Sequence, residues 1–238
     1  MEHLPYYVYL VFGLTTALTL FKLFKAGGKN KNILFIVLVW LGAQSALAIA
    51  GFYKVMDTLP PRFALLTLPP LLFIIFLATT NKGKSLTAGF DRGALTLMHV
   101  IRIPVEMGLF MLCSFKRIPE LITFEGVNFD IFSGITAPVV YYFGYVKKTM
   151  SRGLLIAWNL VCLGLLINVV VHAILALPAP FQQFAFDQPN RAVILFPFIW
   201  LPCFIVMAVL FSHLVCLRSL VNRRTEEHGI LNAEVRAR

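Results

Sequence analysis

The chain has 238 residues, of which 59% are hydrophobic and 13% charged, and its mean hydropathy is +0.81. A soluble domain ordinarily carries about 25% charged residues, so this composition excludes a soluble domain and a disordered chain. The formal net charge of +10 would suggest nucleic-acid binding in a soluble protein, but in so apolar a chain the basic residues first indicate membrane topology. We therefore expect an integral membrane protein whose first partner is the lipid bilayer, with no nucleic-acid partner.

Seven stretches are long and apolar enough to cross a bilayer, whose hydrocarbon core of about 30 Å requires about 20 residues of helix. In chain order they are residues 6–24, 33–52, 63–80, 93–115, 129–146, 154–177 and 192–217. The connections between them are too short to hold a further folded domain. The sequence thus predicts an all-α polytopic membrane protein, in which residues 1–217 form a bundle of seven transmembrane helices and residues 218–238 a short cytoplasmic tail.

Basic residues alternate between the connections of this predicted bundle. Fifteen of the 21 lysine and arginine residues lie in one alternate set of connections and the C-terminal tail, whereas five lie in the other set. Short connections rich in lysine and arginine stay on the cytoplasmic side of a membrane. The sequence therefore predicts that the N-terminus lies outside and the C-terminus lies in the cytoplasm.

The fourth span carries three ionisable residues within its apolar sequence. His99, Arg102 and Glu106 follow one another at steps of three and four, which places them on one stripe of a helix. Charged groups at the centre of a bilayer cost at least about 2.5 kcal/mol each, so they normally face the interior of a bundle. Pro104 cannot donate a hydrogen bond to the carbonyl of Val100, which favours a kink at the same place. The sequence predicts a buried polar site beside this kink.

Depth along the helices, at about 1.5 Å per residue, divides the polar residues of the spans into two layers. The outer layer contains Glu106, Asp130, Asn168 and His172, joined by Glu125 if the loop before the fifth span folds over the bundle. Carboxylates and histidine carry protons and bind divalent cations. The metal candidates are therefore Glu106, Glu125, Asp130 and His172, although their spacing matches no compact metal motif.

The inner layer pairs His99 of the fourth span with His213 of the seventh, with Asn159 of the sixth span nearby. Two histidines at similar depth on different helices can ligate one haem. His99 and His213 are therefore the haem candidates, in competition with the simpler interpretation that His213 lies at the membrane interface. The sequence does not determine a cofactor.

Three segments carry a resemblance to a known group of proteins. They are HVIRIPVEMGLF at 99–110, TFEGVNFDIFSGITAP at 123–138 and FQQFAFDQPNRAVILFPFIW at 181–200. These segments resemble those of an uncharacterised family of bacterial seven-helix integral membrane proteins, and the similarity extends over most of the bundle. The resemblance implies a location in the bacterial cytoplasmic (inner) membrane. It brings no activity, substrate or site residue.

The leading hypothesis is a membrane protein with an outward-opening polar cavity lined by Arg102, Glu106, Asp130 and His172, with Asn168 beside them. Such a cavity would serve the transport or sensing of a small solute or a proton. Arg102 would hold an anionic group or fix the charge of Glu106, the carboxylate expected to carry the proton.

Two other classes of protein remain open at this point. One is a membrane-embedded metal- or haem-dependent enzyme. The other is a structural subunit of a membrane complex, in which Arg102 and Glu106 would touch each other and enclose no cavity. The sequence does not decide whether the protein is an enzyme, nor its substrate, coupling ion or oligomeric state.

Overall fold

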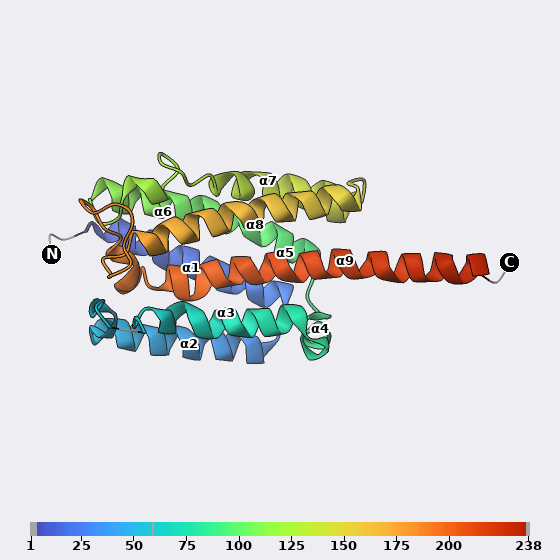
Figure 1. Ribbon diagram of the computed structural model, residues 1–238, viewed down its shortest axis with the longest axis horizontal. Coiled ribbons are helices and arrows are strands. Elements are labelled where there is room, and N and C mark those ends of the chain that lie inside the picture. Colours follow the sequence, from blue (N-terminus) through green and yellow to red (C-terminus); the bar gives the residue numbers. More distant parts are fainter. Residues whose placement is uncertain (1–3, 59, 237–238) are drawn as a thin grey trace.

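The structure is a computed structural model that describes residues 4–58 and 60–236, with side chains described as far as Val221. These described residues form helices, turns and loops, and no strand. The predicted all-α class is therefore confirmed. Most helices run side by side along the long axis of the molecule, and the two ends of the chain lie at opposite ends of it (Figure 1).

The first two helices form an antiparallel pair. Helix α1 runs over Tyr6–Ala26 and α2 over Lys31–Ile49. The chain reverses between them through Gly28 and Lys29, both of which have positive φ angles (67° and 61°). The side chain of Asn30 then accepts a hydrogen bond from the backbone N of Asn32 (2.9 Å) and caps the start of α2.

A sharp bend separates the next two helices. Helix α3 runs over Ala64–Thr79 and α4 over Asn81–Thr87, and their axes differ in direction by 95°. The hydroxyl of Thr80, between them, accepts a hydrogen bond from the backbone N of Gly83 (3.0 Å). A side chain on Gly83 would lie 2.3 Å from the carbonyl oxygen of Leu77, so this close turn requires glycine.

The remaining helices complete the bundle, and several of them are interrupted by short turns of other helix types. They are α5 (Arg92–Met98), a 3₁₀ turn (His99–Ile101), α6 (Arg102–Ser114), α7 (Ile131–Tyr141) with a π-helical turn (Tyr142–Val146), α8 (Arg152–Leu175), a π-helical turn (Leu201–Ile205) and α9 (Val206–Arg236). The interruption at His99–Ile101 lies within the fourth predicted span, shortly before Pro104, which removes a backbone donor from the helix.

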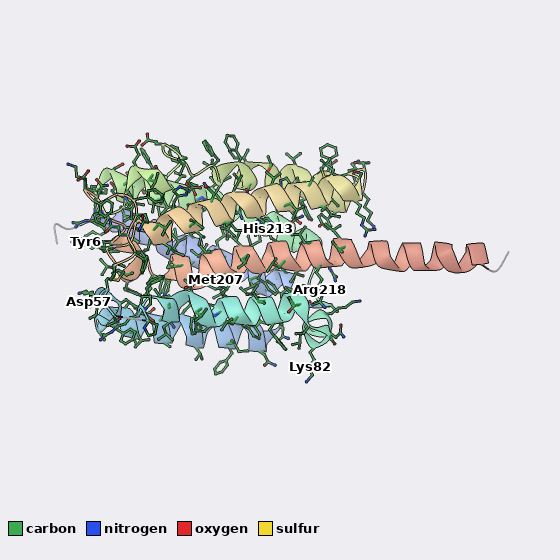
Figure 2. The ribbon with its side chains drawn as sticks, viewed as in Figure 1. Tyr6, Asp57, Lys82, Met207, His213 and Arg218 are labelled. Atoms are coloured by element: carbon green, nitrogen blue, oxygen red, sulfur yellow. The ribbon has the colours of Figure 1, made fainter. Side chains whose placement is uncertain are left out.

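Helix α9 lies at the centre of the packing. It contacts α3, α5 and α8, while α1 packs against α5 and α6. Figure 2 shows His213 on α9 between Met207, towards the middle of the bundle, and Arg218, towards its far end. The helix continues unbroken through the predicted tail as far as Arg236 and projects beyond the other helices. The side chains of residues 222–238, including four basic residues of the charge count, lie outside the described residues.

Several helices are long and apolar enough to span a membrane, as predicted. Five meet that requirement among the described residues, or six if α3 and α4 are taken as one bent span. The predicted third and fifth spans form shorter elements: α3 has 16 residues, or about 24 Å of helix, and Ile131–Val146 is a similarly short apolar helix. The number seven and the orientation therefore stay predictions.

Candidate functional site

The side chain of Arg102 forms the centre of a buried polar network. It is 2% exposed, and its Nη1 atom lies 2.6 Å from Oδ1 of Asp130 in an ion pair. The same Nη1 donates to the carbonyl oxygen of Cys162 (3.3 Å), and Nη2 lies 2.9 Å from Nε2 of His213. Because these partners come from the start of α7, from α8 and from α9, one guanidinium connects four helical segments in the middle of the bundle.

Asp130 immediately precedes α7, a position from which a carboxylate often caps a helix. In the described structure its side chain makes no such capping hydrogen bond and points to Arg102 instead. Arg102 and Asp130 were both predicted to line one polar cavity, and the structure brings these two residues together. The ion-pair partner of Arg102 is thus Asp130 rather than Glu106, which lies one helical turn farther along α6.

Glu106 is also buried, at 1% exposure, but its partner is neutral. Its Oε1 atom accepts a hydrogen bond from Nδ2 of Asn128 (2.6 Å), and its Oε2 has no hydrogen-bond partner among the described residues. Asn128 also donates to the carbonyl of Ile122 (3.1 Å), and its Oδ1 accepts from the backbone N of Asp130 (3.0 Å). One asparagine therefore holds Glu106 and positions the residue that binds Arg102.

Asn128 is a member of the site that was not predicted from the sequence. The available signal was its place two residues before Asp130, because an asparagine side chain commonly accepts a hydrogen bond from the backbone two residues ahead. That pattern predicts a local turn. It carries no information about the contact with Glu106, which depends on the folding of the loop over α6.

Hydrogen-bond donors and acceptors around His213 assign its tautomer. Arginine can only donate, so the Nε2 atom of His213 must accept from Arg102. Nδ1 then carries the hydrogen and donates to Oδ1 of Asn159 (3.0 Å), whose Nδ2 donates to the carbonyl of Leu155 (2.9 Å). His213 is therefore a neutral imidazole with both nitrogens engaged.

His99 lies directly against His213. The two rings are stacked with centroids 4.0 Å apart, and Trp158 approaches the His99 ring edge-on at 5.5 Å. The hydroxyl of Ser212 donates to the carbonyl of Leu95 (2.8 Å), so it accepts from Nε2 of His99 (3.3 Å). The other ring nitrogen, Nδ1, has no partner in the described part of the chain. His99 thus presents a buried nitrogen lone pair.

The 3₁₀ turn explains how His99 and Arg102 reach the same histidine. In a 3₁₀ helix with three residues per turn, side chains three positions apart are eclipsed, whereas in an α-helix they diverge by about 60°. His99 opens this turn and Arg102 follows it, so both side chains project along one line toward His213. The inner layer predicted from sequence, His99 with His213 and Asn159, is brought together in this way.

The other predicted residues of the outer layer lie apart from this network. Asn168 donates to the carbonyl of Val127 (2.9 Å), next to Asn128, so it supports the loop from α8. Nδ1 of His172 donates a hydrogen bond to the carbonyl oxygen of Asn168 on its own helix (2.8 Å). The His172 ring stacks on the ring of Phe184, with the two centroids 5.3 Å apart. Glu125 is exposed. Among the described contacts, neither His172 nor Glu125 is bonded to Arg102, Glu106 or Asp130.

The network does not fit a metal or a haem. Among the side chains that the structure describes, in residues 4–58 and 60–221, no three of histidine, cysteine, aspartate or glutamate come together as a metal site. The rings of His99 and His213 are in face-to-face contact, which leaves no room for a macrocycle between them, and His213 offers no free nitrogen.

Comparison with known proteins places this network inside a defined family. Residues 59–221 match the family model described as Domain of unknown function (DUF8737). The chain belongs to the DUF8737 family. This agrees with the resemblance to an uncharacterised family, and no curated protein and no solved structure matches the chain. The DUF8737 region begins before α3 and ends within α9, so it contains every residue of the network and excludes α1 and α2.

Proposed function

We propose that this DUF8737 protein is a seven-helix protein of the bacterial cytoplasmic membrane that transports or senses a small solute or a proton through the network around Arg102. The proposal counts α3 and Ile131–Val146 as short spans beside the five longer ones. A bilayer accommodates a short span by local thinning at modest cost. The charge distribution supports an outer N-terminus and a cytoplasmic C-terminus.

The observation that carries the proposal is the set of unpaired polar atoms beside the buried ion pair. Nε of Arg102, Oε2 of Glu106 and Nδ1 of His99 are buried and have no partner among the described residues. A purely structural ion pair would be expected to satisfy its neighbouring donors and acceptors, since unpaired buried groups are rare. Ionisable residues inside membrane helices are usually functional. Three such atoms on one stripe support a hydrated site open to a solute or a proton.

The partners of the two charged residues support different roles for them. Arg102 is held by Asp130 and by His213, so its position is fixed by oppositely charged and neutral acceptors. Glu106 is held by the amide of Asn128, which is neutral. Glu106 can therefore gain or lose a proton without leaving a buried cation unpaired. In this proposal Arg102 organises the site and Glu106 is its exchangeable carboxylate.

The test compares Glu106→Gln with Glu120→Gln, the same change at an exposed acid of the following loop. Purified proteins are reconstituted into liposomes containing a pH-sensitive dye, and thermal stabilisation by acetate, phosphate and other small anions is measured in detergent. We expect Glu106→Gln to lower proton flux, or to abolish the stabilisation by an anion, while Glu120→Gln matches the wild type. Equal behaviour of the two variants in both assays, or copurification of a stoichiometric protein partner without any flux, would refute the proposal.

A further inference from the structure

Two groups able to accept a proton lie on opposite sides of Arg102 along the same helix stripe. On one side is Oε2 of Glu106, and on the other is Nδ1 of His99; the side chains are 1% and 0% exposed. A carboxylate oxygen and an imidazole nitrogen each hold a lone pair to which a proton can bind. Neither lone pair is used by the described residues, although the remaining polar atoms of both side chains are bonded.

The position of Arg102 between them makes a continuous path possible. His99 and Glu106 are seven residues apart, which corresponds to a rise of about 10 Å along the helix. The Nε–H group of Arg102 lies between them in sequence and is an unpaired, buried donor. Two or three hydrogen-bonded water molecules, each spanning about 2.8 Å, would cover such a gap, with the Nε–H holding one of them by its oxygen.

The surroundings of both groups favour a proton over a larger solute. His99 is enclosed by the His213 ring, by Trp158 and by the hydroxyl of Ser212. The positive charge of Arg102, which would repel a passing cation, is paired with Asp130 at 2.6 Å. The charged and titratable groups that face Glu106 are Arg102 and Asp130, and those that face His99 are Arg102 and His213.

Resting on the proposed function, we infer that the species handled by this site is the proton, exchanged between Glu106 and His99 through water held by Nε of Arg102. A proton that enters from the side of the loop containing Asn128 binds Oε2 of Glu106. The O–H bond of that acid then breaks as an N–H bond forms at Nδ1 of His99, with each intervening water molecule passing one proton on. Glu106 returns to a carboxylate and His99 becomes an imidazolium, so the net charge of the network is unchanged by the transfer. The imidazolium then releases a proton to water on the side away from Glu106, which returns His99 to its neutral form for the next transfer.

The experiment uses full-length protein in liposomes that contain the pH dye pyranine, with a potassium gradient and valinomycin to drive proton entry. We expect the wild type to change the internal pH faster than empty liposomes do, and to slow in D₂O. Glu106→Gln and His99→Gln should each reduce the initial rate at least about tenfold, as loss of a group that transfers protons does. Glu120→Gln should keep the wild-type rate.

The outcomes separate this inference from the proposed function. If the wild type moves no protons but a small anion stabilises it in a manner that needs Glu106, the proton inference fails and the proposed function stands. If Glu106→Gln abolishes flux while His99→Gln retains it, the path to His99 is wrong. If neither flux nor ligand stabilisation is found, both fail. If a variant does not fold, the inference is tested on the wild type alone. An equal initial rate of pH change in H₂O and in D₂O would contradict proton transfer through water.

Discussion

Helices α5, α6 and α9 are buried within the protein to a much greater extent than α2 is. In each of the helical segments 92–114 and 201–221, 56% of the most apolar 18-residue stretch is buried within the protein. For α2 the corresponding share is 17%. The buried ion pair and both stacked histidines belong to the first group and to the segments that pack on it. The buried ion pair thus lies in the part of the molecule where the helices are most enclosed by protein.

Helix α2 shows the opposite solution. Its side chains Phe35, Ile36 and Val39 are large, apolar and exposed, as expected for a lipid-facing surface. Its buried polar residue, Gln44, accepts a hydrogen bond from the hydroxyl of Tyr53 and so has a partner close by in the chain. The buried polar side chain of α2 therefore forms a hydrogen bond with a nearby segment of the chain. The buried polar side chains around Arg102, in contrast, include atoms without a partner among the described residues. Three substitutions test this contrast.

The largest effect is expected from breaking the central ion pair. Arg102→Met leaves the Asp130 carboxylate buried without its cation, which should lower the free energy of unfolding by about 3 to 5 kcal/mol. Arg102→Met combined with Asp130→Asn removes both charges and should recover most of that loss. Denaturant unfolding in detergent micelles measures all variants. A single Arg102→Met change that leaves stability intact would show that the pair is not buried in the protein.

A smaller effect is expected one contact away. Asn159→Leu removes the acceptor for Nδ1–H of His213 and leaves that donor buried, which should cost about 1 to 3 kcal/mol. The matched control is Asn32→Leu, because Asn32 is exposed and its side chain is outside the network. The same unfolding assay compares them. Equal stability of the two variants would contradict the hydrogen bond between His213 and Asn159.

The smallest effect is expected in the short 3₁₀ turn Phe52–Lys54 that follows α2, and it concerns alkaline pH. Burial, with a lesser contribution from Cys203, raises the pKa of Tyr53 to about 12 from an ordinary value of about 10. Between these values the unfolded chain releases the phenolic proton while the folded protein retains it, so the free energy of unfolding should fall as pH rises. Tyr53→Phe should weaken this decline. Tyr6→Phe, at a tyrosine that is 93% exposed, should leave this decline unchanged. The measurement is the free energy of unfolding of each variant at several pH values.

Much of the architecture and part of the site could be predicted from sequence because both depend on helix geometry. Apolar length located the main spans, and steps of three and four placed His99, Arg102 and Glu106 on one inward stripe. Comparison of depth along the helices brought His213 and Asn159 to the right level. These inferences need only the rise and period of a helix.

Other features depend on how each helix is rotated about its axis and on how the loops fold. The depth of a residue along its helix contains no information about either. Depth alone placed His172 with Glu106, but its ring is turned toward Phe184 instead. The choice of Asp130 over Glu106 as partner for Arg102 follows from where α7 begins relative to α6. Asn128 reaches Glu106 because the loop folds back onto α6. The short forms of the third and fifth spans likewise reflect breaks that composition does not reveal.

Helix α9 joins the buried histidine to the far end of the molecule in one stiff rod. From the π-helical turn before it to Arg236 the rod is about 46 Å long, so a tilt of about 5° around that turn would move its tip about 4 Å. The π-helical turn at Leu201–Ile205 comes just before this helix and gives it a natural pivot. Any rearrangement of the bonds around His213 is therefore geometrically amplified at a distance, beyond the end of the bundle.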